Sequence, residues 1–245
     1  MAEADPSRTP ASPGTHPGPA PGTAGEGYDR VVQRLIPGYA SLARLGVALL
    51  AASPLAGGEG AAVLVAGCGT GAELLEARNQ RPDWRLTAID PSAEMLEIAR
   101  RRVGGDGIAW RRSTVEALAE AEGAAAGFDG ALSVLVLQSL PDDGSKLAFL
   151  SALCRMLRPG GQLVLVDLMQ PERSPLQGQV ESAWLGFQRA SGLDGAAEER
   201  TQLTRGTHPI GLARLTALVN AAGFGDPARI FQALNYEGFL LQRSL

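Results

Sequence analysis

Residues 63–71 read VLVAGCGTG, an apolar run that ends in glycines at alternating positions. The run predicts a buried strand that turns sharply into a helix, because helical spacing begins behind the last glycine. Glycine permits positive φ and lets a ligand approach the backbone without meeting a Cβ. The first N–H groups of the helix, at the positive end of its dipole, suit an anionic group. The stretch therefore predicts a ligand site, although its spacing alone does not decide which ligand binds.

An acidic marker follows about 20 residues later, as in nucleotide-binding α/β folds. Leu86-Thr-Ala-Ile-Asp90 predicts the next strand, which ends in a carboxylate. An acid at this point can accept hydrogen bonds from both hydroxyls of an adenosine ribose. Pro91 and Ser92 lead into a further helix, for which Ser92 is a suitable N-cap. The two motifs together favour an adenosine-containing ligand.

Strands alternate with helices along most of the chain, which predicts a parallel sheet covered by helices on both faces. The predicted strands are Ala61–Ala66, Arg85–Ile89, Ile108–Arg112, Gly130–Val136 and Gln162–Asp167. The predicted helices are Tyr28–Ile36, Tyr39–Ala52, Gly71–Asn79, Ser92–Val103, Val115–Glu122 and Ser145–Leu157. Arg158-Pro159-Gly160 is interpreted as a breaker before the fifth strand. Ala228–Leu234 and Tyr236–Gln242, separated by one Asn, predict an antiparallel hairpin.

Composition limits the possible partners. The 245 residues are 45% hydrophobic, enough to bury a sizeable core, and the formal charge of −4 argues against a nucleic-acid partner. No apolar run is long enough to span a bilayer, so no membrane partner is expected. Two cysteines suggest a reducing compartment and a cytoplasmic location, and with two histidines they form no metal cluster. The basic run Arg100–Arg102 is interpreted as a solvated helix cap.

Two segments fall outside the alternating pattern. Residues 1–26 are rich in Pro, Gly and Ala and lack aromatic residues, so we expect a disordered tail before a single domain over 27–245. An insertion over 170–209 separates the fifth strand from the hairpin, and its first half carries Trp184 and Phe187 on an amphipathic helix. Insertions of this length are commonly lids or binding loops. We therefore expect a helical lid over the ligand site.

Four segments carry a resemblance to a known family: VLVAGCGTG (63–71), LTAIDPSAEML (86–96), FDGALSVLVLQSL (128–140) and LRPGGQLVLVD (157–167). In this order they resemble the class I S-adenosylmethionine-dependent methyltransferases. The resemblance implies an α/β, Rossmann-like fold with a mostly parallel seven-stranded sheet and an antiparallel C-terminal strand. It also implies S-adenosyl-L-methionine as cofactor, with its methionine end at the glycine turn and its ribose on Asp90.

A narrower resemblance points to the carboxy-S-adenosylmethionine synthases. Its matching segments are Arg34–Tyr39, Leu137-Gln138, Phe187–Gly192, Ala221–Phe224 and Ile230–Tyr236. By position it implies a cofactor site made of Tyr39, Gly67, Cys68, Gly69, Asp90, Pro91, Thr114 and Val115, with Val134 close to the sulfonium. Met95 is a further cofactor candidate, under the adenine, with a core methionine as the alternative. The narrower resemblance also implies a homodimer through the insertion and an arginine, here Arg200, that grips the extra carboxylate of the carboxylated cofactor.

The chain departs from that branch at three points. The turn reads GCGTG where the branch has GCSLG, Thr114 replaces an Asp beside the adenine, and Val134 replaces an Asn close to the sulfonium. A carboxylated cofactor needs charge and hydrogen-bond donors at such positions, because an unpaired buried carboxylate is costly. The departures favour a relative that kept the fold and changed the chemistry.

The predicted reaction is in-line methyl transfer to an O or N atom of a small-molecule acceptor. His208 is the candidate base, with a helix-entry or surface histidine as the alternative. Tyr39 is a candidate to orient the acceptor or, alternatively, a packing residue. Trp184 and Arg200 are candidate substrate-binding residues, the first in an apolar pocket and the second on a carboxylate, although lid packing and solvation explain them equally. A cofactor-modifying synthase and a non-catalytic cofactor-binding module stay open as alternative functions.

Overall fold

The computed structural model describes residues 26–122, 127–193 and 206–245. The expected N-terminal tail up to residue 25, most of the second half of the insertion, and Arg200 lie outside the described residues. Structural statements below concern the described part of the chain.

A seven-stranded sheet in the order β3-β2-β1-β4-β5-β7-β6 forms the centre of the described structure. Strands β1 to β5 are parallel to one another, whereas β7 is antiparallel to both β5 and β6. The strands are β1 Ala62–Ala66, β2 Arg85–Asp90, β3 Ile108–Arg112, β4 Phe128–Val134, β5 Leu157–Leu168, β6 Ala228–Ala233 and β7 Tyr236–Gln242. The predicted fold class, including the antiparallel C-terminal strand, is confirmed.

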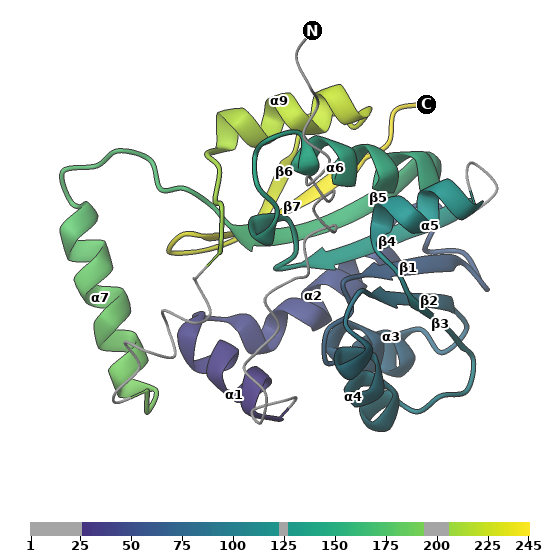
Figure 1. Cartoon of the computed structure of the whole chain (residues 1–245), viewed down its shortest axis with the longest axis horizontal. Coiled ribbons are helices and arrows are strands. Elements are labelled where there is room, and N and C mark those ends of the chain that lie inside the picture. Colours follow the sequence, from purple (N-terminus) through teal and green to yellow (C-terminus); the bar gives the residue numbers. More distant parts are fainter. Residues whose placement is uncertain (1–25, 123–126, 194–205) are drawn as a thin grey trace, which may run out of the picture.

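Helices cover both faces of the sheet (Figure 1). One core lies between the sheet and α5, α6 and α9, and a second lies between the sheet and α2, α3 and α4. The helices are α1 Glu26–Leu35, α2 Tyr39–Ala51, α3 Ala72–Gln80, α4 Ala93–Val103, α5 Val115–Glu122, α6 Ser145–Met156, α7 Gln177–Ala190 and α9 Leu212–Ala222, with a 3₁₀ turn η2 at Leu137–Ser139. Burial of apolar residues on both faces explains the near-continuous apolar runs of the central strands.

The fourth strand begins and ends two residues earlier than predicted. Leu135 has a φ of 59°, a left-handed conformation that is uncommon for a residue with a side chain. This turn ends β4 at Val134 and leads into η2, while the Leu135 amide still donates to the carbonyl of Val166 at 2.7 Å. The hydrophobic pattern continues past the end of the strand, and so it predicted a strand of the right length that was shifted by two residues.

Helix α6 ends at Met156, just before the predicted breaker at 158–160, but the fifth strand begins already at Leu157 and not at the predicted Gln162. Leu157 pairs with Phe128, and the parallel ladder resumes with Gln162 opposite Gly130 after an irregularity. Gly160 has a φ of 80°, and its amide donates to the carbonyl of Arg243 at 3.0 Å. Because Pro159 lies in this irregular part of the strand, its missing N–H removes no bond from the regular ladder.

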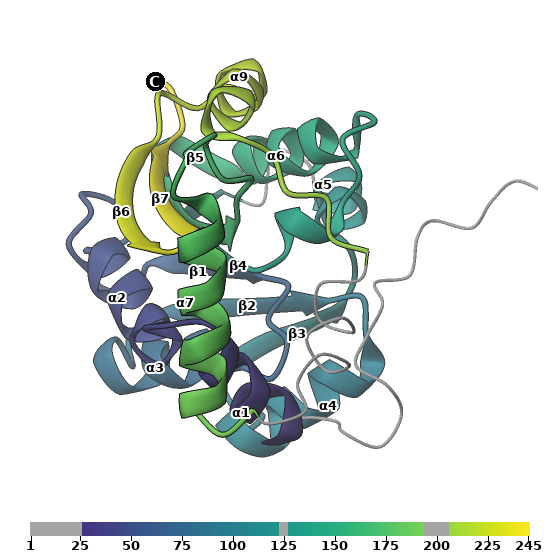
Figure 2. The ribbon, with the colours of Figure 1, turned by 90° about the vertical axis from the view of Figure 1, so that its left-hand side faces the viewer.

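A third apolar cluster lies beyond the ends of β4 and β5. It joins α1 and α7 to residues at the strand ends, with Leu135, Leu168 and Tyr236 among its members. Figure 2 shows α7 lying across this edge of the molecule, alongside α1. The insertion therefore contributes the expected helix over the carboxyl ends of parallel strands, where ligands bind in such folds.

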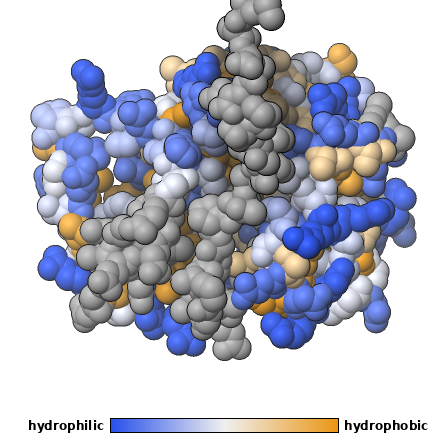
Figure 3. Space-filling view, in the orientation of Figure 1, coloured by the Kyte–Doolittle hydropathy of each residue, from blue (hydrophilic) through white to orange (hydrophobic). Residues whose placement is uncertain are grey.

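The surface shown in Figure 3 is mixed, with hydrophilic residues predominating among those drawn in colour. The large hydrophobic side chains exposed on the described surface include Leu176, Leu185 and Phe187 of the α7 region. Within residues 26–122, 127–193 and 206–245, no helix has the length and apolarity needed to cross a membrane.

Candidate functional site

The glycine turn between β1 and α3 is held against the neighbouring strand. The amides of Gly67 and Cys68 both donate to the carbonyl of Ile89 at 2.9 Å, and the amide of Gly71 closes the turn on the carbonyl of Cys68 at 2.8 Å. Gly67, Gly69 and Gly71 all have positive φ, at 70°, 49° and 85°. The three glycines therefore adopt the positive φ that residues with a Cβ rarely adopt.

The glycines of this turn serve different purposes. A Cβ on Gly67 would lie 2.4 Å from Val136 Cγ2, and one on Gly71 would lie 3.0 Å from Val103 Cγ2. These two glycines allow close packing. A Cβ on Gly69 would meet nothing within 4 Å, so this position faces open space. Gly69 is thus the point of the turn that a ligand can approach.

Asp90 connects this turn to the next helix. Its Oδ2 accepts a hydrogen bond from the amide of Gly69 at 2.9 Å, and its Oδ1 accepts one from the amide of Ser92 at 2.8 Å. Ser92 caps α4 as predicted, because its Oγ accepts from the Met95 amide at 3.3 Å. A carboxylate has about four acceptor sites, so Asp90 can also accept bonds from ribose hydroxyls. The predicted ribose acid therefore lies directly beside Gly69.

Hydrogen bonds and an ion pair connect helix α1 to the glycine turn. Asp29 accepts a hydrogen bond from Thr70 Oγ1 at 2.6 Å and forms an ion pair with Arg102 of α4. Arg102 also donates to Thr70 Oγ1 at 3.3 Å. The interpretation of Arg100–Arg102 as a solvated cap is wrong for Arg102, because α1 brings an acid to it. This network positions α1 over the turn.

Several titratable groups shielded from water lie where α1 meets the glycine turn. Burial raises the pKa of Glu73 to about 7, and burial with nearby carboxylates raises the pKa of Tyr28 to about 12. The pKa of Tyr39 is raised mainly by burial and then by the charge of Glu73. Burial, followed by the charges of Asp90 and Glu73, also raises the pKa of Cys68. Both phenols and the thiol are therefore neutral near pH 7, so Cys68 is no nucleophile.

The residues predicted around the adenine have mixed surroundings. Met95 is buried and Pro91 is half-buried, next to Asp90 and Ser92. Thr114 is exposed, and its Oγ1 accepts from the Ala117 amide at 3.2 Å, so it caps the start of α5. Val115 points its side chain into the core below α5. Its part in an adenine site is therefore limited to its backbone.

Val134 and Trp184, predicted near the sulfonium and in the substrate pocket, lie in two different apolar clusters. Val134, at the end of β4, is half-buried against the core on the α2 side. Trp184 Nε1 donates to the carbonyl of Leu35 at 2.7 Å, and its ring meets Tyr236 edge-on with centroids 6.1 Å apart. Trp184 thus fixes α7 to the end of α1 and lines the apolar cluster between them.

A buried polar group lies at the ends of β4 and β5. Asp167 Oδ1 accepts from the Gln138 amide at 2.9 Å, while Asp167 Oδ2 has no hydrogen-bond partner in the described structure. Burial raises the pKa of Asp167 to about 7, against the opposing effect of backbone hydrogen bonds and of the Lys146 charge. Lys146 is itself buried and donates to the Leu137 carbonyl at 2.6 Å.

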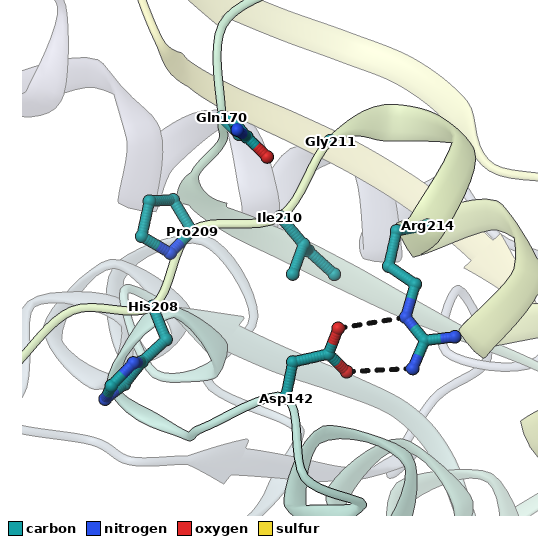
Figure 4. A pocket seen from close by; sticks show the side chains of 7 residues that line it. All are labelled: Asp142, Gln170, His208, Pro209, Ile210, Gly211 and Arg214. Carbon is teal, nitrogen blue, oxygen red and sulfur yellow. Dashed lines mark hydrogen bonds and ion pairs between the residues drawn. The ribbon is translucent and has the colours of Figure 1, made fainter.

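His208 belongs to this end of the site and not to the group around Tyr39. Its amide donates to the Gln138 carbonyl at 2.6 Å, and its side chain lines an open pocket of about 360 Å³ (Figure 4). Asp142 and Arg214 form a bidentate ion pair at the same pocket, with both distances 3.0 Å. His208 is exposed, and no described residue holds its ring as a catalytic base.

Sequence reasoning missed Tyr28, Asp29 and Glu73. Tyr28 and Asp29 lie on α1, more than 30 residues before the turn, and no local pattern connects them to it. Glu73 lies in the first turn of α3, where acids are common, so no sequence pattern indicates that it is buried.

The comparisons with known proteins agree with this geometry. Residues 63–161 match the family described as "Methyltransferase domain". A ubiquinone biosynthesis O-methyltransferase of Methylocella silvestris is 31% identical over 185 residues, covering 72% of this chain and 64% of that protein. The chain therefore spans less than two thirds of the length of that relative.

Two further relatives cover most of the chain. A carboxy-S-adenosyl-L-methionine synthase of Aeromonas salmonicida is 26% identical over 226 residues, 89% of this chain and 87% of that protein. The crystal structure of Burkholderia thailandensis 1,6-didemethyltoxoflavin-N1-methyltransferase, with S-adenosylhomocysteine bound, has a TM-score of 0.56 at 21% identity. The match covers 84% of this chain and 80% of that one.

These matches indicate that the chain resembles the class I S-adenosylmethionine-dependent methyltransferases, with a methyltransferase domain over residues 63–161 and S-adenosylmethionine as the expected cofactor. Its own residues fit the cofactor. Gly69 leaves space where the methionine end lies in this family, and Asp90 offers a carboxylate beside it.

Proposed function

We propose that this protein transfers the methyl group of S-adenosylmethionine to an oxygen or nitrogen atom of a small molecule with an apolar or aromatic part. The observation that carries the proposal is the position of the aromatic cluster of α1, α7 and β7 at the strand ends, next to the cofactor turn. Trp184, which is half-buried, offers a flat apolar surface to a ring, and the buried Tyr236 packs edge-on against it. Relatives named as O- and N-methyltransferases support this chemistry.

Methyl transfer requires the protein mainly to align the acceptor with the methyl group. The cofactor supplies an electrophilic methyl group, and the protein must place a nucleophile in line with it and exclude water. The apolar cluster under α1 and α7 excludes water. A general base is required only for an acceptor that is not already ionised or a free amine. For such an acceptor we propose His208, at the mouth of the neighbouring pocket, as the residue that takes the proton.

A carboxy-S-adenosylmethionine synthase is the second candidate function, because the resemblance to those enzymes extends over 89% of the chain. The charges around the turn favour the methyltransferase. Asp29, Glu73 and Asp90 are acidic, and Arg102, the cation beside them in the described structure, is paired with Asp29. Acidic surroundings suit the cationic methyl donor better than a cofactor with an added carboxylate.

Mass spectrometry separates the two functions. The full-length protein is incubated with S-adenosylmethionine and a panel of phenols, catechols and heteroaromatic amines, and in parallel with S-adenosylmethionine and prephenate. Methylated acceptor together with S-adenosylhomocysteine supports the methyltransferase. A carboxylated cofactor ion in the prephenate reaction, with no methylated acceptor, contradicts it.

A further inference from the structure

The segment that follows β4 leads from the glycine turn to the end of β5. Val136 packs against Gly67, because a Cβ on that glycine would clash with the Val136 side chain. Two residues later, the amide of Gln138 donates to Asp167 Oδ1 at 2.9 Å, near the carboxyl end of β5. Ligands of parallel α/β sheets bind at this edge. Gln138 therefore lies beside the glycine turn, at the edge of the sheet where a methyl acceptor meets the cofactor.

Hydrogen bonds hold Gln138 at every polar group except one. Its carbonyl accepts from the His208 amide at 2.6 Å, and its Oε1 accepts from the Leu168 amide at 2.9 Å. Because a backbone amide can only donate, the oxygen of the side chain must face Leu168 and the nitrogen must face the other way. Among the residues that the structure describes, Nε2 of this half-buried side chain has no hydrogen-bond partner. Two N–H donors in a fixed orientation are thus free.

Two buried charged residues hold the same 3₁₀ turn. Lys146 is 1% exposed and donates from Nζ to the Leu137 carbonyl at 2.6 Å, and Asp167 is 2% exposed. Burying an ammonium group and a carboxyl group costs free energy that apolar side chains would not cost. Asp167 Oδ2 also lacks a partner in the described structure. The backbone of η2 is therefore fixed at a cost in stability, which is typical of a preorganised binding site.

The free donor suits an acceptor with two heteroatoms. A glutamine side chain neither takes up nor releases a proton near pH 7, so Gln138 is no base. A hydrogen bond donated to the attacking atom would occupy the lone pair that attacks the methyl group. The donor can align the acceptor without this penalty only through a second atom with a lone pair.

We propose that Gln138 Nε2 donates a hydrogen bond to an oxygen of the acceptor next to the atom that receives the methyl group. This inference rests on the proposed function and names its substrate class, a ring with a hydrogen-bond-accepting oxygen beside the nucleophile. The backbone bond between Gln138 and His208 places this donor next to the residue proposed as the base.

Two phenols of nearly equal size test the assignment. The first, ortho-methoxyphenol, carries an ether oxygen beside its hydroxyl group, whereas ortho-ethylphenol carries a methylene group at the same place. The full-length protein with S-adenosylmethionine should methylate the first with a kcat/KM about tenfold higher, because the second leaves Gln138 Nε2 without a partner. Mass spectrometry of the methylated products gives both values.

Gln138→Glu isolates the donor. A carboxylate oxygen can still accept from the Leu168 amide, while the second oxygen replaces the N–H groups of Nε2. The preference should disappear in this variant, because its kcat/KM for ortho-methoxyphenol falls about tenfold. Gln138→Met, which lacks both the charge and the donor, should lose the preference as well. Calorimetry should show unchanged binding of S-adenosylhomocysteine to both variants, which indicates an intact glycine turn.

Gln232→Glu is the matched control. Gln232 is exposed on the edge strand β6, which β5 and β7 separate from β4. Its Oε1 accepts from Arg229 Nη1 at 3.3 Å, so the substitution again keeps an acceptor and adds the same charge, but away from η2. This variant should keep the preference of the unaltered protein.

Each contrary result has a separate meaning. The same ratio of kcat/KM values in the unaltered protein and in both Gln138 variants would overturn the proposal. An equal loss of activity on both phenols would make Gln138 a structural residue and would also overturn it, as would methylation of other acceptors but of neither phenol. If the unaltered protein bound S-adenosylhomocysteine but methylated no compound of the panel, the proposed function itself would be wrong, which is a different failure.

Discussion

Asp167→Asn should remove part of the pH dependence of stability. Burial raises the folded-state pKa of Asp167 from 3.8 to about 7. Between these two values the folded protein holds a proton that the unfolded chain has released, so the free energy of unfolding falls as pH rises through this window. The full difference corresponds to about 4 kcal/mol at about 1.36 kcal/mol per pKa unit. About 2.5 kcal/mol of it falls between pH 5 and pH 8.

Urea unfolding at pH 5 and pH 8 measures this effect. The unaltered protein should lose about 2.5 kcal/mol more between the two values than Asp167→Asn does. Asp143→Asn is the control, because Ser145 holds the pKa of the exposed Asp143 below its usual range, and its titration ends before pH 5. It should therefore keep the slope of the unaltered protein. An Asp167→Asn variant with that same slope would refute the reasoning that burial dominates at Asp167.

Three other predictions follow from the same structure. Gly69→Ala should cost about 1–2 kcal/mol of stability through its positive φ and weaken S-adenosylhomocysteine binding more than tenfold. Gly67→Ala should cost about 3 kcal/mol or more of stability, because its Cβ meets Val136. Urea unfolding and calorimetry check both variants, and equal stabilities of the two would contradict the distinction. Asp90→Ala should weaken S-adenosylhomocysteine by about 2–4 kcal/mol in calorimetry, and an unchanged affinity would count against the ribose assignment. Trp184→Phe should loosen α7 by about 1 kcal/mol, which hydrogen exchange should detect as faster exchange of the α7 amides with the strands unaffected. Unchanged exchange in α7 would show that the bond to Leu35 does not hold this helix in place.

Most of the fold could be predicted because the strands and helices carry local patterns. The apolar runs predicted the parallel strands, and Ser92 predicted the start of α4. The hairpin pattern near Asn235 predicted the antiparallel C-terminal strand. The errors arose where a backbone turn, not a residue pattern, ends an element. Leu135 ends β4 by a left-handed φ, and β5 continues through Pro159 because the chain is irregular there.

The site could be predicted only where it is local in sequence. Gly69 and Asp90 belong to motifs, and the structure joins them by a hydrogen bond. The interaction of Arg102 with Asp29 spans 73 residues, and no spacing rule reveals such a pair. Tyr28 and Trp184 reach the site because α1 and α7 fold over the strand ends, which depends on tertiary packing.

A crystal structure of this protein with S-adenosylhomocysteine tests the central claim most directly. It should place the homocysteine end against Gly69, the ribose hydroxyls on the Asp90 carboxylate, and α1 over both. A ligand bound elsewhere, or a ribose whose hydroxyls do not contact the Asp90 carboxylate, would contradict the account.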